Sequence, residues 1–484
     1  MSENQVDYGQ VPAAPNSSRT FISKFSKGKI AALVGSAVGL IAVGIFAAFA
    51  LLSGGGTQPE SVLPSDTVAF AKIDLNPSAG QKINFVRFVS QFPSTFKGFN
   101  SDDPVGSFIT QANLNDSINW TEAKNWIGNR YAIAGVESAR GVEPVVVLAV
   151  KDESAMKYYF AKHNPETHFM MKSGYVLLSS NQSTLDLIAS SPKHLTDNPL
   201  FKDDLAALGG DQVALGWADS KRFIQAERGL ISDLASNNGL NDITKTIEAA
   251  TGRFVLGIHF TSTSVAATFL TRGNPSASLK ALSQSTANIA DLPQNTLAGV
   301  SISGIGSQIA DALSADNNAE SLLSSIGIRP ADLKTLFSGP VSLIVLPGIN
   351  SAAQPLVALR LSPTNSASAL ASIKRLTRNG GILGSLTSQI QIDGANIYLG
   401  EDQNSIQQVI AKVRAKGNLG DLAAFKDAVN RPGFLVAYLN LEKLLPILDI
   451  KGDGRNFKGA GLVTSVDKSN PGSSKSTITL SLKK

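Results

Sequence analysis

The sequence predicts an α+β protein in which one N-terminal transmembrane helix precedes two tandem copies of a mainly antiparallel sheet-plus-helices module. Two observations predict this fold class. A run of 23 residues near the N-terminus contains no charge, and one order of strand, hairpin and helix patterns occurs twice in the remaining chain. Strands and helices do not alternate regularly, which argues against a doubly wound nucleotide-binding sheet.

Residues 1–29 contain two prolines and few large apolar side chains, which is typical of a flexible cytoplasmic tail. Residues 30–52 would form about 35 Å of helix, enough to cross a hydrocarbon core of about 30 Å. Four basic residues precede this run, and the first one after it is Lys72. The positive-inside rule therefore predicts a single-pass plasma membrane protein, with the N-terminus in the cytoplasm and the C-terminal region outside.

Two further features bear on this segment. Ala48-Phe49-Ala50 resembles a signal-peptide cleavage site, so cleavage stays open, although the apolar run is longer than a usual signal core. Gly35 and Gly39 form a GxxxG pair, which would allow a homodimer of such helices, although glycine is also common in membrane helices generally. Residues 53–60 are rich in glycine and read as a flexible linker.

Composition excludes several classes of protein. Of the residues, 43% are hydrophobic and 17% are charged, which is a globular composition. The chain contains no cysteine, so disulfides, thiolate zinc sites and cysteine nucleophiles are excluded. The net charge of +5 is spread thinly over 484 residues, and we expect no nucleic-acid partner.

The predicted duplication places copy one at 61–275, a connecting helix at 276–289, and copy two at 290–484. Copy one opens with Leu63-Pro64-Ser65-Asp66-Thr67-Val68-Ala69, and copy two with Leu292-Pro293-Gln294-Asn295-Thr296-Leu297-Ala298. After each opening, apolar and polar residues alternate with period two, which predicts a half-buried strand. The two copies could share a continuous sheet or pack face to face.

Later features occur in the same order in both copies. Hairpins turn at Ser173-Gly174 and at Asp393-Gly394. The strand that contains Trp217 in copy one corresponds to the strand that contains Tyr438 in copy two. The copies differ after these strands, where copy one has a long stretch, 221–250, that we expect to be helical, and copy two has a short loop.

The chain carries no recognisable catalytic or metal-binding motif. The chain has no G-x-S-x-G, HExxH or phosphate-binding GxxxxGK[ST] pattern. Its histidines, which stand at 163, 168, 194 and 259, form no recognisable triad or metal pattern. The loop from Asp449 to Gly454 has lysine where a calcium loop needs an acid. We therefore expect no cofactor, no metal and no assignable catalytic residue.

The segment 74–82, which follows the first strand of copy one, is the candidate ligand-binding site. Ser78 and Gln81 have capping-box spacing, so the initiation of a helix explains much of this segment. Copy two lacks its proline and lysine, and the exposed N–H groups of a helix start together with Lys82 would suit an anionic group. The candidate residues are Asn76, Ser78, Gly80, Gln81 and Lys82.

The same region carries a family resemblance. The string Leu63-Pro64-x-Asp66-Thr67-x-Ala69, followed by Asp74-Leu75-x-Pro77-Ser78-Ala79-Gly80-Gln81-Lys82 and by Phe88 and Phe92-Pro93, resembles a bacterial, mainly actinobacterial, domain-of-unknown-function family numbered three-three-five-two. The resemblance implies a short cytoplasmic tail, one membrane helix and a large outer domain. It implies no activity and no catalytic residues.

Three functional hypotheses follow. The first is a non-enzymatic, membrane-tethered cell-envelope protein whose outer module binds an envelope protein, a glycan or a lipid. The second is a membrane-anchored hydrolase that acts on cell-wall or lipid material, which would need histidines and carboxylates converging in a cleft. The third is a carrier of lipids or apolar ligands, suggested by phenylalanines at roughly helical spacing, although an amphipathic helix packed into the core also explains them. These phenylalanines are Phe85, Phe88, Phe92, Phe96 and Phe99.

Overall fold

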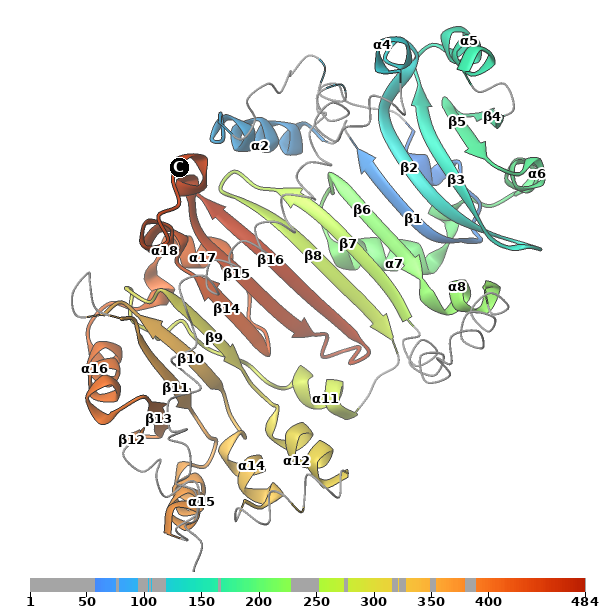
Figure 1. The fold of residues 1–484 in the computed structure, drawn as a ribbon. Helices are drawn as coiled ribbons and strands as arrows, with labels where there is room; N and C mark the ends of the chain where they lie inside the picture. The colour runs from blue at the N-terminus through green and yellow to red at the C-terminus, as the bar shows by residue number, and fades with distance from the viewer. Residues whose placement is uncertain are drawn as a thin grey trace, which may run out of the picture.

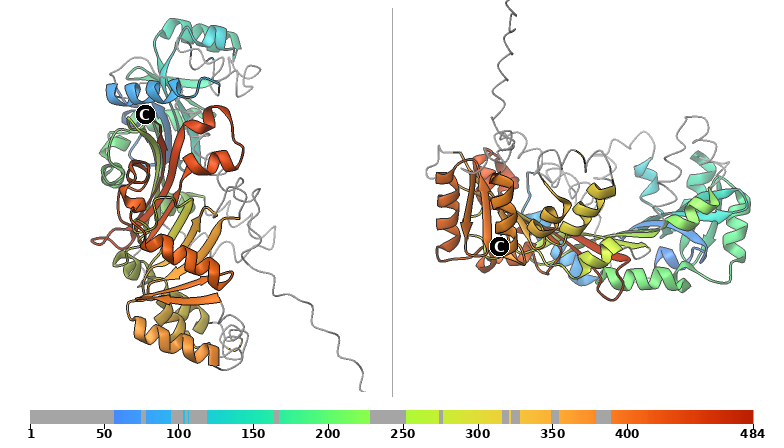
Figure 2. Two further views of the ribbon diagram at one scale, coloured as in Figure 1. Left: turned by 90° about the vertical axis from the view of Figure 1, so that its left-hand side faces the viewer. Right: turned by 90° about the horizontal axis from the view of Figure 1, so that it is seen from below.

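The computed structural model is built on one large antiparallel sheet (Figure 1). The described residues are 57–74, 78–94, 103, 106, 119–163, 167–227, 252–273, 277–315, 321, 328–348, 354–378 and 389–483. Within them the sheet has 16 strands, and the molecule is elongated along the direction in which the strands follow one another (Figure 2).

The sheet consists of two halves with the same strand order. From the centre outward, half one reads β8-β7-β6-β1-β2-β3-β5-β4, and half two reads β16-β15-β14-β9-β10-β11-β13-β12. Half one comprises β1 (Thr67–Asp74), β2 (Ile127–Ser138), β3 (Gly141–Val150), β4 (His168–Lys172), β5 (Tyr175–Ser179), β6 (Ala214–Asp219), β7 (Gly252–Phe260) and β8 (Ser264–Gly273). Half two comprises β9 (Ala298–Ile302), β10 (Val341–Leu346), β11 (Leu356–Leu361), β12 (Ile390–Asp393), β13 (Asn396–Gly400), β14 (Leu435–Leu439), β15 (Phe457–Val466) and β16 (Ser473–Leu482).

An approximate two-fold axis relates the halves and passes between β8 and β16. These strands pair antiparallel, with Thr268 opposite Thr477, and the hydroxyl groups of the two residues are hydrogen-bonded at 3.0 Å. Each strand would be an edge in an isolated half, with a row of unpaired backbone groups. The pairing of β8 with β16 gives these backbone groups hydrogen-bond partners and makes the sheet continuous. The predicted fold class is corrected here, because the strands form a single sheet and not two separate tandem modules.

The predicted transmembrane helix and single-pass plasma membrane location are also corrected. None of the helices in the described part of the chain is both long enough and apolar enough to cross a membrane. The longest of them, α15 (Ser366–Arg378), has 13 residues and thus spans about 20 Å, against about 30 Å of hydrocarbon. Residues 30–52, including Gly35 and Gly39, lie outside the described residues.

One face of the sheet, which we call the covered face, packs against helices in both halves. In half one it buries Phe70 and Trp217 against α6 (Gln182–Ser190) and α7 (Pro199–Leu208). In half two it buries Tyr438 against α16 (Gln403–Arg414) and α17 (Ala423–Ala428). Period-two alternation of apolar side chains on the strands produces this core.

The opposite face, which we call the open face, is covered at its two ends and at its centre. At the outer end of half one lie α4 (Trp120–Ala123) and α5 (Glu153–His163), and at the outer end of half two lie α14 (Pro330–Leu336) and α15. At the centre, α2 (Ala79–Ser90) and α18 (Leu441–Ile447) pack with residues of β7, β8, β15 and β16. The described residues form three further α-helices, which are α8 (Ser220–Ala226), α11 (Ala277–Ser283) and α12 (Gly306–Ala315).

The beginning of the described chain is fixed by a polar cluster at one end of the covered face. Lys72 Nζ lies 2.7 Å from Glu60 Oε1, and Arg130 Nε lies 3.2 Å from Asp74 Oδ1. The Tyr175 hydroxyl donates a hydrogen bond of 2.5 Å to the carbonyl oxygen of Thr57. Residues 57–60 of the predicted linker are therefore held against the sheet.

Candidate functional site

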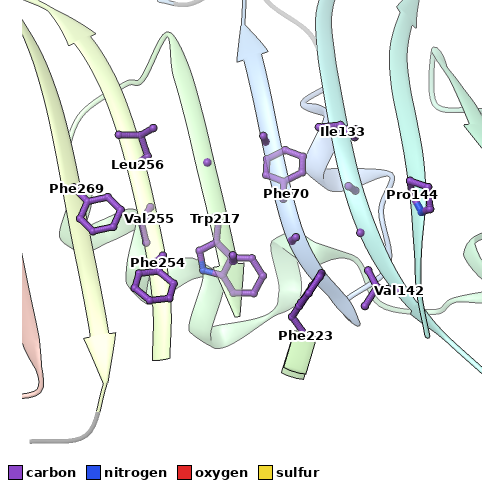
Figure 3. Close-up of a pocket in the computed structure, with 16 residues that line it drawn as sticks. Phe70, Ile133, Val142, Pro144, Trp217, Phe223, Phe254, Val255, Leu256 and Phe269 are labelled. Carbon is purple, nitrogen blue, oxygen red and sulfur yellow. The ribbon is translucent and has the colours of Figure 1, made fainter. Parts of the chain in front are cut away.

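An apolar groove lies on the open face of half one, between the central helices and the outer end (Figure 3). Its volume is about 560 Å³. This value falls within the roughly 300–1,000 Å³ of typical ligand sites. The lining residues are Ala69, Phe70, Ala71, Ile133, Ala134, Gly135, Val142, Pro144, Gly216, Trp217, Ala218, Phe223, Phe254, Val255, Leu256 and Phe269.

The floor of the groove is made of small residues on neighbouring strands. Ala71 of β1 is paired with Ile133 of β2 on one side and with Gly216 of β6 on the other, and Gly216 is paired with Leu256 of β7. The row therefore places two small residues between two large ones. Three strand spacings separate Ile133 from Leu256, so the trough is about 14 Å across at the backbone.

The walls are large apolar side chains that solvent can reach. The exposed fraction is 54% for Ile133, 43% for Leu256, 43% for Phe269 and 40% for Phe223. The rings of Phe254 and Phe269 stack with centroids 6.1 Å apart and strengthen one wall. Neighbouring exposed apolar side chains of this kind mark binding surfaces more often than isolated ones do.

Strand alternation explains how the sequence forms the groove. Phe70, Trp217 and Val255 also border the groove, but their large side chains point to the covered face and join the core of half one. On β1 and β6 the immediate neighbours of Phe70 and Trp217 point to the open face, and they are all small: Ala69, Ala71, Gly216 and Ala218. The covered face is thus filled, while the open face is left with a shallow floor between taller walls.

The groove carries no charge among its lining residues, and charged groups lie at its rim. Arg222 of α8 contacts Glu137 Oε2 at 2.5 Å and Asp66 Oδ1 at 3.4 Å. Glu227 Oε1 accepts a hydrogen bond of 2.5 Å from the backbone N–H of Val142. These contacts fix α8, and with it Phe223, at one end of the groove. None of the described residues that line the groove is titratable.

The residues of the predicted anion site do not converge with the groove. Asn76 lies outside the described residues, and Ser78 makes no side-chain cap to α2. Gln81 forms two hydrogen bonds with the backbone of Phe260, at 2.8 and 2.9 Å. Gln81 therefore fastens α2 to β7, so the capping box does not form. Gly80 is exposed and Lys82 is half-buried on the same helix.

The phenylalanines of the carrier hypothesis belong to the core where the structure describes them. Phe85, Phe88 and Phe92 are buried in the central cluster beneath α2. The ring of Phe92 contacts the ring of Phe457 of half two in a tilted arrangement, with ring centroids 4.9 Å apart. Phe96 and Phe99 lie outside the described residues. The apolar surface that is open to a ligand is thus formed by other residues, in the groove.

None of the four histidines lines the groove. His163 Nε2 is 2.9 Å from Glu122 Oε2 on an exposed surface. His259 points to the covered face, where burial and the charge of Lys475 lower its pKa. Within the described residues no group of three or more histidine, aspartate or glutamate side chains could hold a metal ion.

Sequence reasoning missed the groove. The only signal was the run of small residues at alternate positions of the β1 and β6 strands, Ala69, Ala71, Gly216 and Ala218. That signal becomes informative only when β1 and β6 are known to be neighbours and to lie in register.

Comparisons with known proteins identify no family. No family model and no curated protein matches the chain, so the resemblance drawn from the sequence stays a prediction. Two solved structures of a protein named TP0453 are weakly similar. Crystal form III has 10% identity and a TM-score of 0.19, covering 73% of this chain and 98% of that one. Crystal form I has 9% identity and a TM-score of 0.16, covering 75% and 99%. Likeness at this level supports no argument about fold or function.

Proposed function

We propose that this protein is a non-enzymatic binding protein whose apolar groove receives an amphipathic helix of a partner protein. One observation carries the proposal: at the position related by the approximate two-fold axis, helices of the chain itself pack over the corresponding row of side chains. Two further considerations, the width of the groove and the absence of charge from its lining, support the same conclusion.

The two-fold relation is read from strand register. In half one, Ala69, Ala218 and Phe254 are opposite one another on β1, β6 and β7. In half two, the corresponding strands β9, β14 and β15 carry a second row in the same order. It consists of Ala298, Leu439 and Ala460. The first row lines the groove, whereas Leu439 and Ala460 belong to the central cluster beneath α2.

Two helices lie over this row. Helix α18 packs against β15 and contributes Leu441 and Leu445 to the central cluster, whereas α2 is fastened to β7 by Gln81, and Phe92 just after α2 contacts Phe457 of half two. Phe85 and Phe88 lie one turn apart on α2, and Phe92 follows the end of the helix in the same cluster. The helix that follows β9 is α12, and it contains no aromatic residue. Gly306 of α12 lies instead against the backbone of α14, where an added Cβ would be 2.8 Å from the carbonyl oxygen of Phe337. The helix that follows β6 as α18 follows β14 is α8, and of its residues only Phe223 lines the groove. Among the described helices, neither α8 nor α12 therefore fills it.

The width of the groove favours a helix over a single acyl chain. An α-helix with its side chains is about 10–12 Å in diameter, which matches a trough of about 14 Å. A single acyl chain contacts neighbouring carbon atoms at about 4 Å and would fill only part of that width. The small side chains of the floor would also let a helix approach closely, and three buried apolar anchors would each contribute about 1.5–3 kcal/mol.

Titration calorimetry with synthetic peptides tests the proposal. Three amphipathic 17-residue peptides, with phenylalanine, leucine or isoleucine at positions i, i+3 and i+7, would be titrated into the purified chain. We expect micromolar binding of at least one peptide with a stoichiometry of one. Ala71→Leu should weaken this binding at least about tenfold, because the added methyl groups occupy the floor.

The matched control is Ala161→Leu, which makes the same change at an exposed position of α5. It should bind the peptides as the unmodified chain does. Palmitate is titrated in parallel. Binding of palmitate alone, abolished by Ala71→Leu, would assign the groove to apolar ligands and overturn the proposal. Failure of all three peptides to bind, or equal binding by both variants, would also overturn it.

A further inference from the structure

Two basic side chains of half two lie at the seam between the halves, on the covered face. Arg431 Nη2 donates a hydrogen bond of 2.5 Å to Thr477 Oγ1 and also contacts the carbonyl oxygen of Lys475 at 3.5 Å. Lys475 Nζ donates to the carbonyl oxygens of Ala207 and Leu208, both at 2.9 Å. We call Arg431 and Lys475 the seam pair.

The seam pair lies beside the approximate two-fold axis and draws on both halves. Thr477, which Arg431 contacts, is hydrogen-bonded to Thr268 of β8 on the axis itself. Lys475 reaches the last turn of α7, a helix of half one. A ligand bound here would therefore contact elements of both halves.

The seam pair lacks the carboxylate partner that Arg130 and Arg360, the two arginines buried in the described part of the chain, both have. Arg130 pairs with Asp74, and Arg360 has Asp291 Oδ2 2.6 Å from its Nη1. Within the described residues, Arg431 and Lys475 form no salt bridge with a carboxylate; their contacts are carbonyl oxygens and a hydroxyl.

Three basic groups on the covered face have lowered pKa values. Burial lowers the pKa of Arg431, and burial together with the charge of Arg431 lowers the pKa of Lys475. His259, on the same face of the sheet, has its pKa lowered by burial and by Lys475. Partly buried cations without a counter-charge are costly, so an anion placed between them would relieve this repulsion.

We propose that the seam pair binds an oxyanion of the phosphate type. Arginine presents a planar fork of donors and lysine a compact charge, a combination that suits an anion with several oxygen atoms. Both side chains are only half-buried, so a small solute can reach them. Because the seam joins the halves, the bound anion would stabilise the sheet at its centre. This site is separate from the groove and independent of its proposed partner.

The test measures thermal unfolding of the whole chain in increasing inorganic phosphate, with sodium chloride at matched ionic strength. A ligand that binds only the folded state raises the unfolding midpoint with its concentration. We expect a saturable rise in phosphate that chloride does not produce. Arg431→Gln and Lys475→Gln should raise the apparent dissociation constant at least about tenfold. Glycerol 1-phosphate is measured in parallel, and tighter binding of this ester than of phosphate would identify a phosphoryl group carried on a larger molecule.

The matched control is Lys451→Gln, which removes the same charge from an exposed position of half two. It should respond to phosphate as the unmodified chain does. Lys475→Gln also removes two hydrogen bonds to α7 and therefore lowers stability by itself. If Lys475→Gln does not fold, the phosphate response of Arg431→Gln decides the test. A phosphate response that is unchanged in Arg431→Gln, or is matched by chloride, would overturn the proposal.

Discussion

Two strand glycines that face opposite sides of the sheet should respond in opposite ways to the same substitution. Gly461 of β15 faces α17, and a Cβ at this position would overlap the carbonyl oxygen of Ala428 and lie 3.0 Å from its Cβ. Gly216 of β6 faces the groove, where the nearest atom to an added Cβ is Leu256 Cβ, at 3.7 Å. The first contact is an overlap with backbone, and the second is ordinary van der Waals contact.

Gly461→Ala should therefore lower the free energy of unfolding by about 3 kcal/mol, because overpacking typically costs about 1–3 kcal/mol and a helix backbone cannot move aside as a side chain can. Gly216→Ala should leave it unchanged or raise it by about 0.5–1 kcal/mol, since alanine is favoured over glycine within a strand. Urea unfolding followed by circular dichroism measures both changes. Equal midpoints for the two variants, or the reverse order, would refute the assignment of the covered and open faces.

Two other predictions concern buried polar groups. Asp204 is fully buried and accepts from Trp217 Nε1 at 3.0 Å and from Arg253 Nε at 2.7 Å, so Asp204→Asn should cost about 3–5 kcal/mol of stability in urea unfolding. Asp203→Asn, on the exposed side of the same helix, should cost less than about 0.5 kcal/mol, and similar losses in both would contradict this role. Burial raises the pKa of Tyr175 to about 12. The unfolded chain releases this proton near pH 10, so stability should fall between pH 10 and about 12; Tyr175→Phe should reduce this fall, and an unchanged pH profile would contradict the assignment.

Local patterns were sufficient to locate many elements. Period-two alternation predicts strands at the two openings, where β1 and β9 lie, and the Asp393-Gly394 signal predicts the turn between β12 and β13. These features depend on a few neighbouring residues, whose steric preferences act within one strand or turn. The stretch 221–250 was expected to be helical; α8 occupies its beginning, and 228–250 lies outside the described residues.

The candidate sites were beyond the reach of such patterns because they depend on which strands are neighbours. Gln81 has the spacing of a helix cap, yet its side chain bonds Phe260, which is distant in sequence. The groove needs β1 beside β6 and β7, and the seam pair needs β16 beside β8. Nothing in the local sequence of Ala71 or Arg431 distinguishes them from ordinary surface residues.

The sequence alone determined the apolar periodicity of each strand, the absence of cysteine chemistry and the repeated order of elements along the chain. The tertiary structure decided that β8 and β16 pair, so that the strands form a single sheet with one covered and one open face. The physical reason is that strand pairing depends on backbone hydrogen bonds, which every residue except proline can make, and is therefore weakly encoded in side-chain identity. Where two edge strands meet, satisfying their unpaired backbone groups decides the architecture, and the groove and the seam pair follow from that pairing.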